Sequence, residues 1–134
     1  MAMAIARTWS GTTRAADADR YLDYLMRTGL KEYAATPGHE GVVALRRIEG
    51  DEAEFRLVSV WRDWKAVEAF AGPRADRAVF YPEDDEFLVQ RDEFADHFEV
   101  VFSEGPARRR LRDRIVEWWV RQATPALRPV NSPD

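Results

Sequence analysis

The chain has 134 residues, of which 46% are hydrophobic and 33% are charged, and 24 acidic against 20 basic side chains give a formal net charge of −4. These values are typical of one folded globular domain and exclude an intrinsically disordered chain. The absence of cysteine excludes disulfide bonds, a thiolate nucleophile and sulfur-ligated metal centres. No basic leader precedes an apolar run, and no apolar run approaches the roughly 18 residues of a membrane helix. We therefore expect a cytoplasmic protein without a membrane partner.

The N-terminal part of the chain predicts a strand followed by a helix. Residues Met3 to Gly11 place Ile5, Arg7 and Trp9 on one side of an extended chain and small side chains on the other, as in a strand. From 17 to 33 the apolar side chains recur every three or four residues, which indicates one amphipathic helix.

A β-hairpin and a short second helix follow. Residues 42–48 and 53–61 are rich in β-branched and aromatic side chains, and Gly50 between them supplies the turn. Asp63 is in place to cap a helix of about two turns that begins at Trp64.

The last elements are a short helix, a strand and a C-terminal extension. Proline and four acids in the stretch 81–86 suit a helix N-terminus, where solvent and the helix dipole account for the acids. Alternation over 97–102 predicts the last strand. The arginine-rich stretch after Gly105 predicts a helix, and the residues from Thr124 onward predict a loose, proline-containing tail.

Strand, helix, strand, strand, helix, strand is the order of the ferredoxin-like split βαβ arrangement, an α+β fold with a four-stranded antiparallel sheet and both helices on one face. We expect it to span residues 1–105, with 106–134 as a helical extension. Both sides of the strands are apolar, since Val58 and Val60 oppose Phe55 and its neighbours. This pattern favours a homodimer in which two sheets pack face to face, although the C-terminal helix covering its own sheet is an alternative.

Four segments together resemble the antibiotic biosynthesis monooxygenase-like proteins of the dimeric α+β barrel superfamily, over roughly residues 3–103. They read IARTWSGTT, LVSVWRDWKAVEAFAG, RAVFYPEDDEFL and DHFEVV. The resemblance implies a monooxygenase that works without a cofactor on a small aromatic or polyketide-like molecule. The alternative is a non-catalytic dimeric member that binds a small ligand or has a structural role.

The resemblance places His97 at the start of the last strand, where its imidazole would point into a pocket between sheet and helices. A histidine there suits the transfer of a phenolic proton, and Tyr81 is the second candidate catalytic residue. A histidine that is hydrogen-bonded for structural reasons is the alternative. His39, beside Pro37 and Gly38, is expected in a loop.

Arg7 and Trp9 are candidate substrate-binding residues because they share one side of a central strand. A buried arginine needs an acceptor. That acceptor is either a ligand anion or an internal carboxylate, Glu99 on the last strand or an acid near residue 85.

Trp61 and Trp64 bracket the turn into the second helix and are the other candidate substrate-binding residues. Together with Tyr81 they would suit a cavity for a planar molecule, and Trp61 is favoured because it ends a strand. Packing in the core is the alternative.

The sequence argues against a cofactor, a metal and a nucleic-acid partner. Haem degraders of the resembled superfamily use an asparagine on the first strand and a histidine after the strand-end tryptophan. Here Arg7 takes the first position, and no histidine occurs between His39 and His97. Four adjacent acids at 83–86 do not all face one ion. The arginines of 108–121 lie in an acidic protein and are expected to form an exposed face or to clasp the acidic stretch 83–99.

Overall fold

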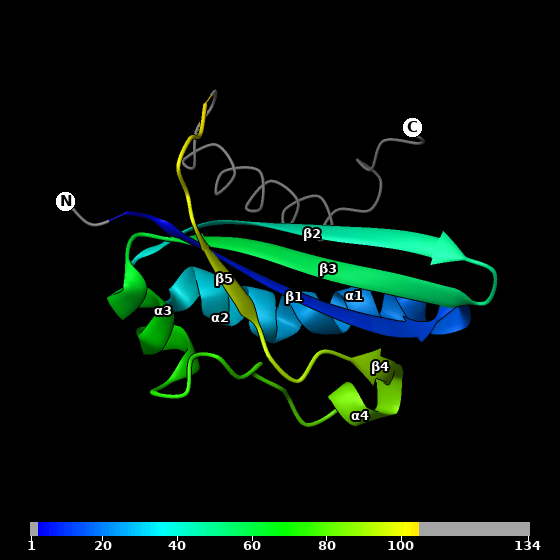
Figure 1. The fold of residues 1–134 in the computed structure, drawn as a ribbon. Helices are drawn as coiled ribbons and strands as arrows, with labels where there is room; N and C mark the ends of the chain where they lie inside the picture. The colour runs from blue at the N-terminus through cyan, green and yellow to red at the C-terminus, as the bar shows by residue number, and fades with distance from the viewer. Residues whose placement is uncertain (1–2, 105–134) are drawn as a thin grey trace, which may run out of the picture.

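The computed structural model describes residues 3–104, which form an antiparallel five-stranded sheet with helices on one side (Figure 1). The elements are β1 (Ile5–Arg14), the 3-10 helix η1 (Ala15–Asp17), α1 (Ala18–Arg27), α2 (Gly29–Ala35), β2 (His39–Glu49), β3 (Glu52–Trp61), α3 (Trp64–Ala71), α4 (Asp84–Phe87), β4 (Leu88–Arg91) and β5 (Asp96–Glu99). The α+β ferredoxin-like architecture expected from the sequence is confirmed. The expected C-terminal helix and tail lie outside the described residues.

The sheet has β1 at its centre and five strands instead of the four expected. Its order is β2-β3-β1, and both β4 and β5 pair with β1 on the remaining side. β5 pairs with the segment Ile5–Thr8 and β4 with Gly11–Thr13, so two short strands share the position of one long strand. Residues 92–95 leave the sheet between them, and Phe94 forms a bridge with Arg77 instead. The last strand is therefore shorter than the predicted 97–102.

Alternation in β3 separates the two faces of the sheet. Every second side chain from Ala53 to Trp61 is buried, whereas the intervening side chains are partly or fully exposed. The helices cover the buried side, where Tyr21 and Leu25 of α1 and Leu30 and Tyr33 of α2 complete the core. Strand pairing places Arg7 and Trp9 of β1 on this same side, opposite Ser59 and Leu57. The predicted sidedness of β1 is thus confirmed.

The single helix expected over 17–33 is two helices with a break at Thr28, whose φ and ψ are −116° and −94°. The Thr28 hydroxyl donates a hydrogen bond to the Tyr24 carbonyl, 2.7 Å away, which satisfies an acceptor at the end of α1. Threonine side chains that bond back to the preceding turn compete with regular helix. Glycine at position 29 then starts α2 and leaves space beside the ring of Tyr81.

β1 runs past Gly11, where the sequence predicted its end. A side chain at Gly11 would collide with the indole ring of Trp9, two residues before it on the same face. Gly11 is therefore a site of close packing inside a strand, not a turn residue.

His39 was expected in a loop, and that prediction is wrong. It begins β2, is 5% exposed, and its ring centre lies 5.0 Å from that of Trp61 and 5.8 Å from that of Tyr33. The turn before it is made by Gly38, whose positive φ of 92° and contact with Ala66 leave no room for a side chain.

The helices after the hairpin agree with the sequence. Asp63 caps α3, because its Oδ1 accepts a hydrogen bond of 3.0 Å from the Ala66 N–H. α4 forms within the predicted acidic stretch but has only four residues. In the described part of the chain, no helix is long and apolar enough to span a bilayer.

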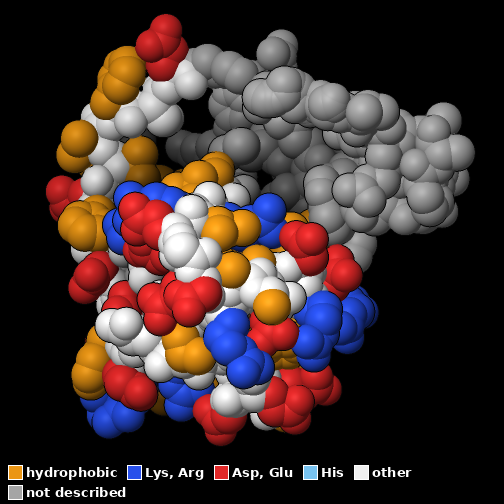
Figure 2. Space-filling view, turned by 90° about the vertical axis from the view of Figure 1, so that its right-hand side faces the viewer, with side chains coloured by type: hydrophobic (Ala, Val, Ile, Leu, Met, Phe, Trp, Pro, Cys, Tyr) orange, Lys and Arg blue, Asp and Glu red, His pale blue; other side chains and the backbone are white. Residues whose placement is uncertain are grey.

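The end of the molecule that carries the β2–β3 turn is highly charged. Figure 2 looks at this end and shows basic and acidic side chains intermixed on its surface. Glu54 lies between Arg47 and Arg56 in a three-residue ion-pair network, and Arg46 pairs with Asp19. Exposed ion pairs of this kind contribute little to stability.

Candidate functional site

A cavity lies between the buried side of the sheet, the helices α1 and α2, and the stretch from Ala78 to Asp84. About 30 Å³ of it is open to the centre of a water-sized sphere, which corresponds to about two water molecules. Its lining is aromatic and aliphatic apart from one arginine and one aspartate. The lining residues are Arg7, Trp9, Tyr21, Leu25, Gly29, Tyr33, Leu57, Phe70, Ala78, Val79, Tyr81 and Asp84.

Arg7 forms the cationic wall of the cavity and is only 3% exposed. Its guanidinium donates to the carbonyl of Ala75 at 2.6 Å and to that of Arg77 at 3.0 Å. Burial lowers the pKa of Arg7, while the neighbouring Tyr33 hydroxyl acts in the opposite direction. A neutral arginine is nevertheless out of reach near neutral pH, so the wall carries a full positive charge.

His97, on the neighbouring strand β5, is a hydrogen-bond partner of Arg7. The two residues face each other in the β1–β5 pairing, and His97 Nε2 lies 2.9 Å from Arg7 Nη1. Because a guanidinium only donates, Nε2 accepts, and the imidazole is neutral with its proton on Nδ1. Burial and then the Arg7 charge lower the pKa of His97, which agrees with this assignment. His97 does not line the cavity.

The internal carboxylate partner proposed for Arg7 is absent among the described residues. In the β1–β5 pairing Glu99 faces Ile5, two residues away, and it is exposed. Asp85, on α4, pairs with Arg91 instead, with 2.7 Å between Oδ1 and Nη1. Arg7 is thus stabilised by neutral acceptors.

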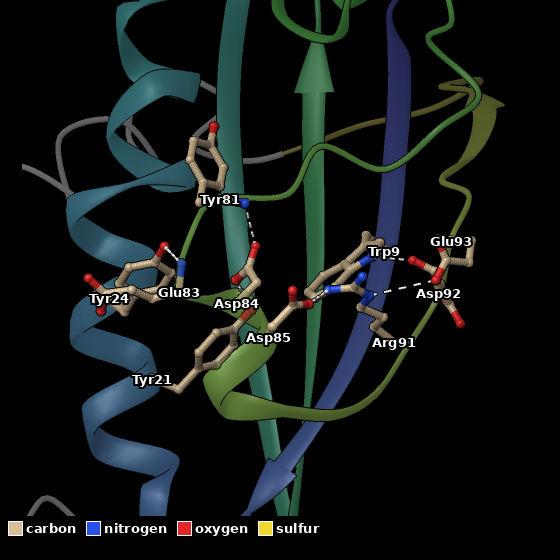
Figure 3. Close-up of polar contacts among 10 residues, drawn as sticks. All are labelled: Trp9, Tyr21, Tyr24, Tyr81, Glu83, Asp84, Asp85, Arg91, Asp92 and Glu93. Carbon is tan, nitrogen blue, oxygen red and sulfur yellow. Dashed lines mark hydrogen bonds and ion pairs between the residues drawn. The ribbon is translucent and has the colours of Figure 1, made fainter.

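Asp84 forms the acidic wall, and Figure 3 shows it between Tyr21 of α1 and Tyr81. Its Oδ2 accepts a 2.6 Å hydrogen bond from the Tyr81 N–H, and its Oδ1 accepts one of 3.3 Å from the Tyr21 hydroxyl. The residue is 4% exposed, and burial raises the pKa of its carboxyl despite these donors. The expectation that solvent accounts for the acids at 83–86 is therefore wrong for Asp84.

Tyr81 and Trp9 lie where the sequence expected them, in the wall of the cavity. The Tyr81 hydroxyl donates to Glu32 Oε1 at 3.0 Å, and burial, together with Glu32, raises its pKa well above the ordinary value. Tyr81 is therefore a hydrogen-bond donor at neutral pH and not a base. The Trp9 indole N–H donates to the Asp92 carbonyl at 2.8 Å, so its ring position is fixed (Figure 3).

Trp61 and Trp64 do not line the cavity. Trp61 is fully buried, its indole N–H donates to Ser59 Oγ at 2.9 Å, and its ring stacks on Phe70. Core packing, the alternative for Trp61, is what the structure shows. Trp64 is 43% exposed on α3, with its ring centre 4.8 Å from that of His97.

Three lining residues that carry polar groups were missed by sequence reasoning. In the sequence, Tyr21 and Tyr33 occupy apolar positions of an amphipathic helix, which predicts that they belong to the core. Asp84 is one of four adjacent acids. Asp84 occupies the only one of those four positions that α4 turns inward, and nothing in the sequence distinguishes it from Asp85. No cluster of three or more metal-ligating side chains occurs within residues 3–104.

The fold is shared with several solved structures, whereas no family model and no curated protein matches the sequence. A Bacillus cereus protein provisionally described as an antibiotic biosynthesis monooxygenase is 12% identical, with a TM-score of 0.55 over 77% of this chain and 98% of that one. A protein of unknown function from Nitrosomonas europaea is 15% identical, with a TM-score of 0.58 over 78% and 96% of the two chains. Rv0793 from Mycobacterium tuberculosis is 15% identical, with a TM-score of 0.53 over 76% and 99%.

These similarities confirm at the level of the fold the resemblance that the sequence indicated. Identities of this size do not carry a function from one chain to another, because one fold supports many activities.

Proposed function

We propose that the protein is a cofactor-independent monooxygenase-like enzyme that acts on a small aromatic or polyketide-like molecule in the cavity between sheet and helices. The observation that carries the proposal is the composition of this cavity, whose aromatic walls contain two buried charged residues, Arg7 and Asp84. An apolar site with a few convergent polar groups is the usual form of a small-molecule site.

For oxygenation without a cofactor, the protein has to supply a proton acceptor and an apolar environment. A phenol such as 1-naphthol, once deprotonated, is electron-rich enough to reduce oxygen directly. Oxygen adds at the carbon para to the hydroxyl, that carbon loses its hydrogen, and the O–O bond breaks. In sum, 1-naphthol and O₂ give 1,4-naphthoquinone and water, with no external reductant.

We assign the role of proton acceptor to Asp84, whereas Tyr81 contributes its ring to the cavity wall because its hydroxyl proton is donated to Glu32. The sequence pointed to His97 as the base, but its Nε2 lone pair faces Arg7 and it lies outside the cavity lining. Asp84 lines the cavity, and its raised pKa brings it closer to that of the proton donor, which favours general base catalysis. His97 then serves as a positioning residue for Arg7.

Binding of an aromatic ring requires the cavity to widen, because its present space accommodates about two water molecules. The stretch from Ala78 to Tyr81 supplies one wall and has neither helix nor strand structure. Displacement of this stretch is the simplest way to admit a ligand without disturbing the sheet.

Oxygen uptake with 1-naphthol tests the proposal. We expect the wild-type protein to consume oxygen and to form 1,4-naphthoquinone, and Asp84→Asn to lower kcat by about 10²-fold or more, the contribution of a general base. Asp85→Asn is the matched control, since Asp85 is exposed and pairs with Arg91 outside the cavity. No oxygen uptake by the wild-type protein with hydroxylated naphthalenes or anthrones contradicts the proposal.

The alternative function is a non-catalytic dimeric protein that binds a small ligand or has a structural role. The small volume of the cavity favours the structural role, because an aromatic ring does not fit into the space of about two water molecules. Ligand binding without oxygen consumption is the outcome that supports this alternative.

The proposal includes a cytoplasmic homodimer that carries no resident cofactor. On the face of the sheet opposite the helices, Val43 pairs with Val58 and Ala6 with Val60, and Phe98 lies beside Ala6. An apolar sheet face of this kind suits packing against a second copy.

A further inference from the structure

Arg7 is a buried cation whose hydrogen-bond partners among the described residues are all neutral. It is 3% exposed, and no carboxylate is among its hydrogen-bond or ion-pair partners in the described part of the chain. Taking a charge out of water costs several kcal/mol, and hydrogen bonds to carbonyl groups offset only part of that cost. An anion beside Arg7 would offset the remainder.

The guanidinium has donor capacity left for a ligand. It carries five N–H groups; hydrogen bonds to Ala75, Arg77 and His97 use three of them, and the Tyr33 hydroxyl interacts with a fourth. The Tyr33 hydroxyl lies beside it, and the ring of Phe70 has its centre 5.8 Å from the guanidinium carbon. Arg7, Tyr33 and Phe70 all line the cavity, so a cation, a hydroxyl group and an apolar ring border the same space.

We propose that Arg7 is the residue that holds the ligand in this cavity, by binding it in its anionic form. The inference rests on the proposed function and specifies which residue binds its substrate. The ligand hydroxyl gives its proton to Asp84, which lines the same cavity, and the oxygen keeps the electron pair next to Arg7. No other reactant is needed for this step.

The surroundings hold Arg7 in this orientation before any ligand arrives. Two backbone carbonyls and His97 fix its guanidinium on three sides, which lowers the cost of ordering it on binding. His97 remains neutral in this arrangement, so it adds no second positive charge. The other titratable groups that face the cavity are Tyr21, Tyr33, Tyr81 and Asp84.

The test is a spectroscopic titration of bound 4-nitrophenol, whose phenolate form absorbs visible light. We expect the bound probe to titrate at a pH about one unit or more below the free probe, which corresponds to at least about tenfold tighter binding of phenolate than of phenol. 4-Nitroanisole, which has no ionisable hydroxyl, should bind more weakly than the phenolate. An unshifted or raised bound pKa, or no binding of the phenolate, overturns the inference.

Variants separate the charge of Arg7 from its packing. Arg7→Gln should abolish the preference for phenolate, whereas Arg7→Lys should keep most of it. Arg77→Gln is the matched control, because the Arg77 side chain is exposed over Phe94 while its backbone carbonyl still accepts from Arg7. If Arg7→Gln does not fold, the wild-type titration and Arg7→Lys still decide the question.

The two proposals fail in distinguishable ways. A shifted pKa of bound 4-nitrophenol without oxygen uptake from any phenol supports the anion site and rejects the oxygenase. Oxygen uptake without a preference for phenolate rejects the anion site and leaves the oxygenase in place.

Discussion

Arg7 and Asp84 are the two charged residues that line the cavity, and within the described residues each is buried and hydrogen-bonded to neutral groups. Structural ion pairs bring opposite charges together, whereas here backbone groups, His97 and the Tyr21 hydroxyl satisfy them separately. Perturbed ionisable groups gathered at one cavity are characteristic of functional sites. The arrangement therefore favours a role in binding or proton transfer over one in stability.

The buried carboxyl of Asp84 predicts a pH-dependent difference in stability. Burial raises its pKa in the folded state, so the ionised form costs folding free energy above that pKa, and protonation removes this cost as the pH falls. Relative to Asp84→Asn, the wild-type protein should gain stability as the pH falls from about 7 towards about 4. Urea unfolding of both proteins at several pH values measures this, and a constant difference across the range would show that Asp84 is not perturbed.

Sequence reasoning at the residue scale named one of the two charged residues that line the cavity, Arg7, but missed the other, Asp84. Arg7, Trp9 and Tyr81 were predicted as site residues, and all three line the cavity. Trp61 was misplaced, because an aromatic residue at a strand end fits either a pocket or a core, and only the packing of Phe70 and Tyr33 against it decides. Asp84 was missed because its inward direction depends on where α4 begins.

The helices α1 and α2 form the wall opposite the sheet, and their junction shapes the cavity. Thr28 ends α1 with a hydrogen bond back to Tyr24, and Gly29 starts α2. Gly29 lines the cavity, and an added Cβ there would contact the Tyr81 ring at an ordinary distance of 3.6 Å.

Gly29→Ala should therefore stabilise the fold and weaken ligand binding at once. Alanine in a helix gains about 0.4–1 kcal/mol over glycine where no strain arises, and its methyl group fills part of the cavity. Thermal unfolding and the 4-nitrophenol titration measure the two effects. Gly38→Ala is the control and should destabilise the fold, since Gly38 has a positive φ and contacts Ala66. Unchanged ligand affinity in Gly29→Ala would contradict the assignment of this cavity as the binding site.

Sequence periodicity predicted most elements because it reports which face of each element is buried. It predicted the order of the main strands and the cap of α3, but it did not predict the division of the fourth strand position into β4 and β5. That division depends on pairing with the two halves of β1, and pairing between distant segments leaves no periodic signal. The extent of β1 was likewise underestimated, because Gly11 resembles a turn residue unless the position of the Trp9 ring is known.

At the scale of the whole molecule, the sheet face opposite the helices is apolar and is not covered by any described element. Leu45 on this face is 46% exposed and Phe98 is 57% exposed within the described residues. The sequence left two explanations open. Either two chains dimerise through this face, or the C-terminal residues 106–134 cover it. Residues 106–134 lie outside the described part of the chain.

Leu45→Glu distinguishes the two explanations. If two sheets pack face to face, light scattering should report twice the chain mass for the wild-type protein and a shift towards monomer for the variant, because a charge is introduced into an apolar interface. Ile48→Glu is the matched control, since Ile48 is 51% exposed but pairs with Ala53 on the helix-facing side of the sheet. A wild-type protein that is monomeric at all concentrations rejects the dimer.

The most direct test of the central claim, that the cavity beside β1 is the ligand site, is a ¹H–¹⁵N spectrum of the tryptophan indole N–H groups during addition of 1-naphthol. We expect the Trp9 signal to move, because its ring lines the cavity, while the signals of Trp61 in the core and Trp64 on α3 stay in place. The variant Trp9→Phe identifies the Trp9 signal. Movement of the Trp64 signal with a stationary Trp9 signal would place the ligand on the surface beside His97 and would show that the cavity is not the ligand site.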